Sequence, residues 1–227
     1  MTDSLIAIVP AAGVGQRAGQ AGLPDLPKQY RMLAGQPMLR LAVAALLADP
    51  RIGQVRVAVS PGDDRAAPAL AGLPRTVCRP CGGPTRAATV AAALADSGAA
   101  DNDWILVHDA ARPGLPPDAL AHLVDVCLTD AVGGLLALPV ADTVKSGGPR
   151  VRATLDRDGL WLAQTPQMFR AGLLRAALAR AQAAGVTVTD EASAIEAAGH
   201  APLLVPGAMR NFKVTWPNDF ELMEKWL

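Results

Sequence analysis

The chain has 227 residues, of which 21 are lysine or arginine and 21 are aspartate or glutamate. Because these charges balance, no global field attracts nucleic acid or a membrane surface, and we expect neither as a partner. No apolar run approaches the roughly 18 residues of a membrane span, and the first strand lacks the flanks of a signal peptide, so the sequence predicts a cytoplasmic protein.

An apolar run at Leu5–Val9 opens the chain and predicts a strand. It leads into Pro10-Ala11-Ala12-Gly13-Val14-Gly15-Gln16-Arg17, and Pro27-Lys28-Gln29-Tyr30 follows. Small residues let backbone N–H groups turn toward an anion, and Arg17 and Lys28 add full positive charge. The opening therefore predicts a loop that holds the phosphates of a nucleotide.

The same glycines also fit two other kinds of turn. Gly13-x-Gly15-x-x-Ala18 satisfies the dinucleotide-binding pattern, but that pattern needs an acidic residue about 20 positions on, and Leu33–Pro37 has none. A P-loop needs Gly-Lys-Ser/Thr, and the chain has no Gly-Lys pair. A tight turn without a ligand remains open at this point, because such turns are common in α/β folds.

Strand-like and helix-like segments alternate along the chain. The expected strands are Val55–Val59, Thr76–Cys78, Trp104–Val107 and Gly134–Leu138, and the expected helices include Thr85–Leu94 and Pro117–Leu128. This rhythm predicts an α/β fold with a mostly parallel sheet and helices on both faces, where ligands gather at the carboxyl ends of the strands.

Three cysteines cannot form a disulfide framework. Cys78 and Cys81 have the spacing of half a zinc site or of a redox pair, but none of the histidines forms a second ligand pair. We favour two ordinary cysteines at the end of a strand.

Residues 139–160 break the alternation. Val140–Lys145 and Arg150–Leu155 alternate in polarity on either side of Gly147-Gly148-Pro149, so they predict a β-hairpin that protrudes as an arm. No linker or repeat divides the chain, and we expect residues 1–227 to form a single domain with this arm.

A second motif, His108-Asp109-Ala110-Ala111-Arg112-Pro113, follows the Trp104–Val107 strand directly. An aspartate at the carboxyl end of a central strand is well placed to bind Mg²⁺. The planar guanidinium of Arg112 is suited to a substrate phosphate. Taken alone, the motif leaves an alternative open, in which Asp109 caps the next helix and Arg112 forms a surface salt bridge.

Two further motifs lie near the C-terminus. Asn211-Phe212-Lys213-Val214-Thr215 alternates like a short strand with Lys213 on one face, although a lone lysine on an edge strand is usually solvated. In Thr187–Ser193, Thr189 or Asp190 precedes a helix, and Asp190 and Glu191 are residues that a helix start prefers without any ligand.

Together these segments resemble the 2-C-methyl-D-erythritol 4-phosphate cytidylyltransferases of the non-mevalonate isoprenoid pathway, over nearly the whole chain. The motifs that carry the resemblance are Pro10-Ala11-Ala12-Gly13-x-Gly15-x-Arg17, Pro27-Lys28-Gln29-Tyr30, Ser60-Pro61-Gly62-Asp63, His108–Pro113, Asp142-Thr143, Asp156-Arg157-x-Gly159-Leu160-Trp161, Thr165-Pro166-Gln167, Thr189–Ser193 and Asn211-x-Lys213-Val214-Thr215. So many motifs in one order make chance an implausible explanation.

The resemblance implies transfer of a cytidylyl group from CTP to the phosphate of methylerythritol 4-phosphate, with release of pyrophosphate. It also implies a Rossmann-like sheet, Mg²⁺ as cofactor and a homodimer. In such a transfer the acceptor phosphate attacks the α-phosphorus in line, so catalysis is mainly positioning and charge stabilisation. A phosphate monoester is already an anionic nucleophile, and it needs no general base.

The matching positions imply a role for each site residue. Catalysis is implied for Arg17, Lys28 and Lys213, and Mg²⁺ binding for Asp109. The implied nucleotide-binding residues are Pro10, Ala11, Ala12, Gly13, Gly15, Gly83 and Thr89. The implied acceptor-binding residues are Arg112, Thr143, Arg157, Thr165 and Thr189. In the family, the arginine matching Arg157 lies on the arm and enters the neighbouring subunit's site, which makes the arm a dimer contact.

The sequence departs from the family pattern at Pro84, where relatives often have an acidic residue, so a carboxylate contact is lost there. The loop from Arg17 to Lys28 is longer than in many relatives, and we expect it to be mobile without CTP. Two alternatives stay open. One is a cytidylyltransferase for another polyol phosphate, such as ribitol 5-phosphate. The other is a non-catalytic nucleotide-binding protein of the same fold, which should have lost a cation or the metal carboxylate.

Overall fold

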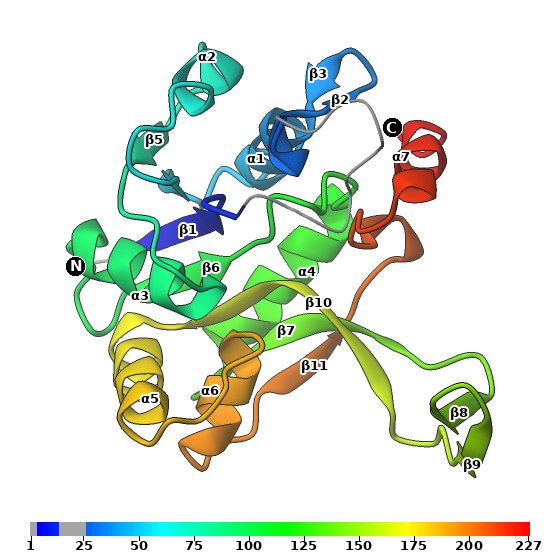
Figure 1. Cartoon of the computed structure of the whole chain (residues 1–227). Helices are drawn as coiled ribbons and strands as arrows, with labels where there is room; N and C mark the ends of the chain where they lie inside the picture. Colours follow the sequence, from blue (N-terminus) through cyan, green and yellow to red (C-terminus); the bar gives the residue numbers. More distant parts are fainter. Residues whose placement is uncertain (1–3, 14–25) are drawn as a thin grey trace.

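The computed structural model describes residues 4–13 and 26–227. Seven strands form the central sheet, in the order β11-β7-β10-β6-β1-β4-β5 (Figure 1). Their bounds are β1 Leu5–Pro10, β4 Gln54–Ala58, β5 Thr76–Arg79, β6 Trp104–Val107, β7 Gly133–Pro139, β10 Trp161–Arg170 and β11 Leu203–Pro206. Neighbouring strands of this sheet are parallel, except that β10 runs antiparallel to β6 and β7. The predicted mostly parallel sheet is confirmed.

The middle strands explain why the sequence pattern there is a continuous apolar run. β1 pairs with β4 on one side and with β6 on the other, and all four residues of β6 are buried. A parallel strand that is covered on both faces has no polar side, so it does not alternate in polarity. The carboxyl ends of β1, β4 and β6 consequently lie at one edge of the sheet, where their loops meet.

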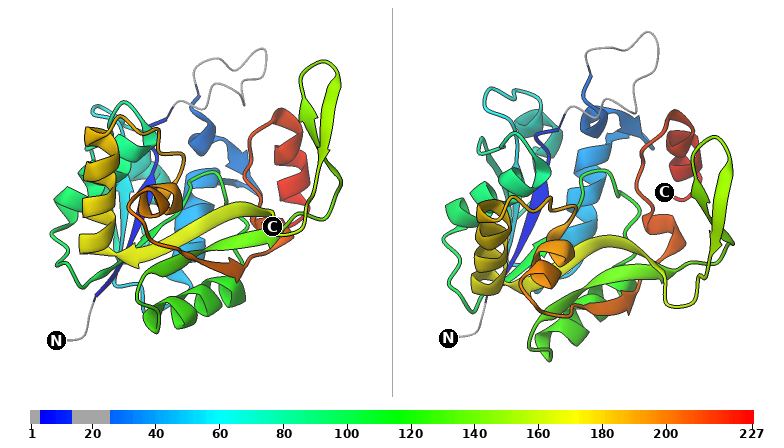
Figure 2. Two further views of the ribbon diagram at one scale, coloured as in Figure 1. Left: turned by 90° about the horizontal axis from the view of Figure 1, so that it is seen from below. Right: turned by 60° about the horizontal axis from the view of Figure 1, so that its bottom comes forward.

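Helices cover both faces of the sheet (Figure 2). On one face, α1 (Met38–Leu47) and α4 (Pro117–Leu128) pack a core that includes Leu39, Leu46 and Leu120. On the other, α3 (Arg86–Ser97), α5 (Ala171–Ala183) and α6 (Glu191–Ala197) pack a second core. The remaining elements are α2 Ala66–Leu70, α7 Pro217–Glu224, the 3₁₀ turns η2 Lys28–Tyr30 and η3 Met209–Asn211, and the short pair β2 Met32–Leu33 and β3 Gln36–Pro37.

Helix α3, which borders the site, has clear end signals. The hydroxyl of Thr85 accepts a hydrogen bond from the backbone of Ala88 at the N-terminus, and Gly98 ends the helix with a φ of 69°. A threonine cap and a left-handed glycine are the residues that these two positions favour. Within the described ranges, no helix is long and apolar enough to cross a membrane.

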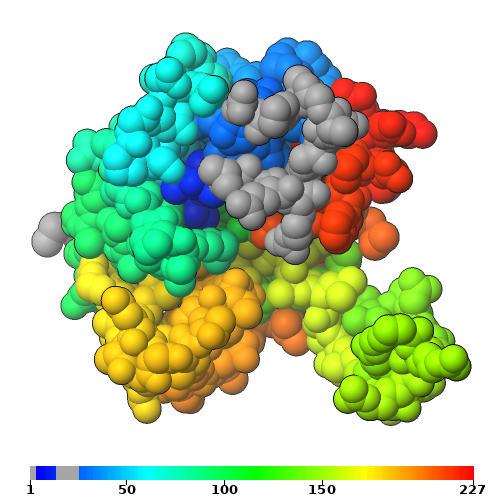
Figure 3. All heavy atoms as spheres, viewed as in Figure 1, coloured from blue at the N-terminus to red at the C-terminus, as the bar shows by residue number. Residues whose placement is uncertain are grey.

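The predicted hairpin is present as a two-stranded antiparallel pair, β8 (Val144–Gly147) and β9 (Val151–Leu155), apart from the main sheet. Figure 3 shows it as a separate lobe beside the body of the molecule. The first strand begins at Val144 and not at the predicted Val140, because the backbone N–H of Val140 still bonds to Leu160 and prolongs the pairing of β7 with β10.

The predicted strand at Asn211–Thr215 is wrong. Asn211 ends the turn η3, and the next four residues are irregular, with the Val214 N–H donating to the carbonyl of Ala111 at 2.9 Å. The alternation has another cause, since Val214 is buried and Phe212 half-buried in a small apolar cluster with Phe220. Lys213 lies between these two residues, and its side chain is 40% exposed.

Candidate active site

A cavity of about 480 Å³ opens where the loops after β1 and β6 meet the start of α3. Its lining contains six of the seven predicted nucleotide-binding residues and both predicted lysines. The lining residues are Pro10, Ala11, Ala12, Gly13, Lys28, Gln29, Gly83, Pro84, Thr85, Arg86, Thr89, Asp109, Ala110, Ala111 and Lys213. The two other predicted residues, Gly15 and Arg17, and most of the loop expected to be mobile lie outside the described residues.

A second cavity of about 270 Å³ adjoins the first and shares Arg86, Asp109 and Lys213 with it. Three predicted acceptor-binding residues also line it, namely Arg112, Thr165 and Thr189. Thr143 and Arg157, both in the described part of the chain, lie outside the two linings. They lie on the arm beside β8 and β9, where the Arg157 guanidinium donates to the carbonyl of Ala141.

Asp109 lines both cavities and lies close to three cationic side chains. Its Oδ1 lies 2.9 Å from Arg86 Nε, and its Oδ2 lies 2.8 Å from Lys213 Nζ and 3.7 Å from Arg112 Nε. Burial raises the pKa of this carboxyl group, but the three cations outweigh burial and hold the pKa far below its usual range. The carboxylate is therefore ionised at neutral pH.

The alternative of a helix cap and a surface salt bridge is excluded for this motif. Helix α4 begins at Pro117 with Pro116 as its N-cap, well beyond Asp109. Arg112 is buried, and its guanidinium donates to the carbonyl of Asn211 at 2.7 Å and to that of Ala163 at 3.2 Å. Its Nε has no hydrogen-bond partner among the described residues.

Sequence reasoning missed a carboxylate in this network. Both oxygens of Glu191 accept from the Arg86 guanidinium, at 2.8 and 2.9 Å, and the glutamate is fully buried. Burial raises the pKa of Glu191, and the charge of Arg86 opposes that shift. The only sequence signal was an acidic first turn of α6, but the cap itself is Asp190, whose Oδ1 accepts from the Ser193 N–H. Glu191 instead fixes the guanidinium that contacts Asp109.

A buried histidine supports the same strand end. His108 Nε2 lies 3.0 Å from the carbonyl oxygen of Arg112, and Nδ1 lies 2.9 Å from the Thr165 hydroxyl. That hydroxyl accepts from the Asp109 N–H at 3.0 Å. Burial lowers the pKa of His108 from 6.5 to about 4, so its ring is neutral at physiological pH. Thr165 is thus tied to β6 as well as lining the smaller cavity.

Lys28 and Lys213 both line the larger cavity, and the side chain of Lys28 bonds to the backbone next to Lys213. Lys28 Nζ donates to the carbonyl of Val214 at 2.6 Å, one residue beyond Lys213. Thr89, a predicted nucleotide-binding residue in the cavity lining, also has a structural role. Its hydroxyl accepts from the Gly83 N–H at 3.0 Å and donates to the Thr85 carbonyl at 2.9 Å, so it stabilises the loop before α3.

Comparison with known proteins shows to which family the chain belongs. The family model described as 2-C-methyl-D-erythritol 4-phosphate cytidylyltransferase matches residues 5–227. The chain belongs to the 2-C-methyl-D-erythritol 4-phosphate cytidylyltransferase family. A cytidylyltransferase of this name from Bordetella petrii is 90% identical over 227 residues, covering 100% of both chains, and one from Bordetella pertussis is 79% identical with the same coverage.

Solved structures of the cytidylyltransferase family share the fold. The enzyme of Francisella tularensis has a TM-score of 0.84 at 33% identity, covering 99% of this chain and 100% of its own. A structure described as 4-diphosphocytidyl-2C-methyl-D-erythritol synthase has a TM-score of 0.86 at 40% identity, covering 100% of this chain and 99% of its own. The Rossmann-like α/β sheet with a separate hairpin is thereby confirmed.

The larger cavity has few groups that could bind the Mg²⁺ that the cytidylyltransferase resemblance implies. Among the described residues, Asp109 supplies the only carboxylate on the larger cavity, and no cluster of three histidine, cysteine or acidic residues is suited to a metal ion. One carboxylate combined with phosphate oxygens is a usual Mg²⁺ site. The residues fit an ion that binds together with a triphosphate, because the phosphate oxygens would offset the positive charges of Arg86 and Lys213 beside Asp109.

Proposed function

We propose that the two cavities transfer the cytidylyl group of CTP to 2-C-methyl-D-erythritol 4-phosphate, giving 4-diphosphocytidyl-2-C-methyl-D-erythritol and pyrophosphate in isoprenoid precursor biosynthesis. One observation carries the proposal: the larger cavity, with the predicted nucleotide-binding residues, meets the smaller one at Asp109 and Lys213. Two substrates bound on either side of this junction would bring their phosphates together.

In this reaction an oxygen of the acceptor phosphate attacks the α-phosphorus of CTP. A new P–O bond forms, the bond from the α-phosphorus to the oxygen that bridges to the β-phosphate breaks, and pyrophosphate leaves with that electron pair. No proton has to be moved, but negative charge builds up on the α-phosphate and on the leaving group. Lys28 and Lys213 lie on the cavity wall where this charge would develop, and Arg17 is proposed to act beside them.

The smaller cavity is proposed to hold the acceptor. Arg112 is the anchor for its phosphate, because its buried Nε is without a hydrogen-bond partner in the described part of the chain. Thr165 and Thr189 offer hydroxyl groups to the polyol. Removing a bidentate or charge-assisted contact of this kind would weaken acceptor binding more than nucleotide binding.

Asp109 is proposed to hold Mg²⁺ together with the triphosphate. When bound, the ion neutralises part of the charge on the phosphates. Arg86 and Glu191 fix the orientation of the Asp109 carboxylate before the nucleotide enters. Chelation of Mg²⁺ should therefore abolish pyrophosphate release, and release that continues in excess chelator would contradict the assignment.

We also propose a homodimer formed through the arm at 139–160. Every residue of β9 is exposed, among them Val151 and Leu155, and Thr143 and Arg157 lie outside the cavities of their own chain. A twofold, isologous pairing would let each arm reach the acceptor cavity of its partner. The cytoplasmic location, the absence of nucleic-acid partners and the single-domain organisation stay predictions.

Mixing two impaired variants tests the exchange of arms, at a methylerythritol 4-phosphate concentration low enough that both variants are slow. In a heterodimer of Lys28→Ala and Arg157→Ala chains, one site combines an intact Lys28 with an intact Arg157 from the other chain. Random exchange of subunits should restore about one quarter of the wild-type sites. No recovery after exchange, with heterodimers verified by tagged chains, would contradict an Arg157 that acts across the interface.

The activity itself is tested by pyrophosphate release from CTP and Mg²⁺ with methylerythritol 4-phosphate, run in parallel with ribitol 5-phosphate. We expect release with the first acceptor alone. Release only with ribitol 5-phosphate would keep the nucleotide site and overturn the acceptor. No pyrophosphate release with either acceptor would support the non-catalytic alternative.

A further inference from the structure

The motif Ser60-Pro61-Gly62-Asp63 has no role in the reaction described above. It nevertheless bonds to the loop after β1 and to the turn that contains Lys28. It forms the turn after β4, with the Asp63 N–H donating to the Ser60 carbonyl at 3.1 Å. From this turn, the Ser60 hydroxyl donates to the carbonyl of Ala12 in the loop after β1 at 2.9 Å. The Asp63 Oδ2 accepts from the hydroxyl of Tyr30 at 2.6 Å.

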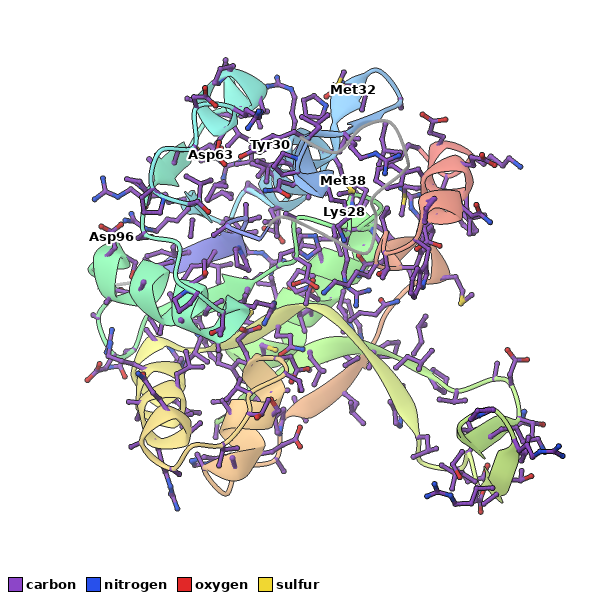
Figure 4. All side chains as sticks on the ribbon, in the orientation of Figure 1. Lys28, Tyr30, Met32, Met38, Asp63 and Asp96 are labelled. Carbon is purple, nitrogen blue, oxygen red and sulfur yellow. The ribbon has the colours of Figure 1, made fainter. Side chains whose placement is uncertain are left out.

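Tyr30 belongs to the same three-residue turn as Lys28. Such a short 3₁₀ turn has little stability of its own, so the side chains that anchor it decide where Lys28 lies. Two anchors are present: Gln29 Nε2 donates to the carbonyl of Ala11 at 2.8 Å, and Tyr30 bonds to Asp63. In Figure 4, Tyr30 lies between Asp63 and Lys28.

Gln29 and Tyr30 are each 6% exposed, and Asp63 is half-buried. A hydrogen bond to a carboxylate is stronger than one between neutral groups, and burial of the tyrosine side limits competition from water. Burial and the bond to Asp63 also raise the pKa of Tyr30 far above its usual range, so its hydroxyl remains a donor at any working pH.

We propose that the Tyr30–Asp63 hydrogen bond is a positioning contact. It fixes the position of the turn that contains Lys28 relative to the loop at residues 11–13. Tyr30 and Asp63 are positioning residues, since both lie outside the lining of the larger cavity. The inference rests on the proposed function, because Lys28 must face a reacting phosphate for its position to matter. A displacement of about 1 Å of a catalytic group is enough to cost about 100-fold in rate.

Tyr30→Phe is the sharpest variant, because it removes one oxygen and keeps the buried ring. Lys28 acts mainly in the transition state, so we expect kcat to fall about 10-fold or more while the KM values for CTP and for methylerythritol 4-phosphate stay within about two-fold. An unchanged kcat in a folded Tyr30→Phe protein would overturn the proposal. Pyrophosphate release at saturating substrates gives both parameters.

Asp63→Ala has a matched control elsewhere in the chain. The Asp63 Oδ1 accepts from the N–H groups of Arg65 and Ala66 at 3.0 and 3.1 Å, so Asp63→Ala also removes a turn contact. Asp130 makes the same pattern before β7, with its Oδ1 accepting from Val132 and Gly133 at 2.7 and 2.8 Å. It has no bond to a tyrosine, because Tyr30 is the only tyrosine in the chain.

We expect Asp63→Ala to lower kcat as Tyr30→Phe does and Asp130→Ala to keep the wild-type kcat. An equal loss of kcat in both aspartate variants would mean a general effect of turn destabilisation and would overturn the assignment. Should Asp63→Ala fail to fold, Tyr30→Phe still decides the question.

A double-mutant cycle shows whether Tyr30 acts through Lys28. In a Lys28→Ala background, assayed at high enzyme concentration, Tyr30→Phe should cause no further loss, because the group that it positions is absent. The same fold-loss in both backgrounds would overturn the proposal. A wild-type protein that releases no pyrophosphate would instead refute the proposed function, which keeps the two failures distinct.

Discussion

The surroundings of Asp109 and the arm use charged residues in opposite ways. Around Asp109, the carboxylates are buried and are paired with cations, as in the contacts of Arg86 with Asp109 and Glu191. On the arm, all of β9 is exposed, and Lys145 bonds only to the hydroxyl of Thr154 among the contacts that the structure gives it. The first region can stabilise charge without rearranging, whereas the second leaves its side chains exposed to solvent.

This difference divides the proposed site into two halves. A single chain already assembles the lining of the larger cavity, so its dipoles and charges are preorganised for the triphosphate. The proposed acceptor residues Thr143 and Arg157 lie outside the lining of the smaller cavity in a single chain. Variants in the two regions should therefore separate stability, nucleotide chemistry and acceptor use.

The largest effect is expected for stability at the buried end. Glu191→Ala leaves the Arg86 guanidinium without its bidentate partner, and breaking a buried ion pair by removing one partner costs about 3–5 kcal/mol. Lys145→Ala on the arm should change the free energy of unfolding by less than about 0.5 kcal/mol. Urea titrations of both variants measure the contrast, and similar losses would contradict the division into a buried network and a solvated arm.

Lys28→Ala should come next, with a fall of about 10²–10³-fold in kcat, because its charge is proposed to stabilise the transition state. Its side chain is only half-buried and donates to the backbone carbonyl of Val214, so folding should be retained. Steady-state pyrophosphate release and thermal unfolding check the two halves of this expectation. A near-wild-type rate would refute the catalytic role.

The buried His108 predicts a pH dependence that the arm, which contains no histidine, cannot contribute. Its folded pKa of about 4 lies below the unfolded value of 6.5, so the unfolded chain binds more protons between these values. The contribution of His108 to the free energy of unfolding is fully present above pH 6.5. It falls by about 3 kcal/mol as the pH falls toward 4. In His108→Gln, the fall in unfolding free energy from pH 6.5 to 5 should be smaller than in the wild type.

The smallest effect is expected on the arm. Arg157→Ala should raise the KM for methylerythritol 4-phosphate about 10-fold, the loss of one charge-assisted contact, and leave the KM for CTP and the unfolding free energy unchanged. Initial rates with each substrate varied in turn provide the comparison. Equal changes in both KM values would argue against a role confined to the acceptor.

Much of the fold could be predicted from local pattern. The apolar runs that became β1, β4 and β6 need cover on both faces, which only a parallel sheet between helix layers provides. The strand predicted around Lys213 was wrong because period-two alternation reports only which side chains are buried. Burial of Val214 in a side cluster produces the same pattern as a strand without any partner strand.

The site was predictable as far as its residues stand in contiguous motifs. Lys28, Asp109 and Lys213 come from three distant segments, and the structure brings them to one cavity. Glu191 stands in the motif Thr189–Ser193, but its role could not be found in this way, because an acidic residue in the first turn of a helix is explained by the helix alone. Its burial against Arg86 depends on how α6 packs beside α3, and nothing local in the sequence encodes that packing.

The hydrogen bonds of His108 have a direction, and that direction limits what Thr165 can offer. The carbonyl of Arg112 can only accept, so Nε2 carries the ring proton and Nδ1 must accept from the Thr165 hydroxyl. The proton of that hydroxyl is therefore already committed, while its oxygen still has a lone pair beyond the one used by the Asp109 N–H. Toward a bound molecule Thr165 is an acceptor only, which selects a hydroxyl group that donates and disfavours a phosphate oxygen at that point.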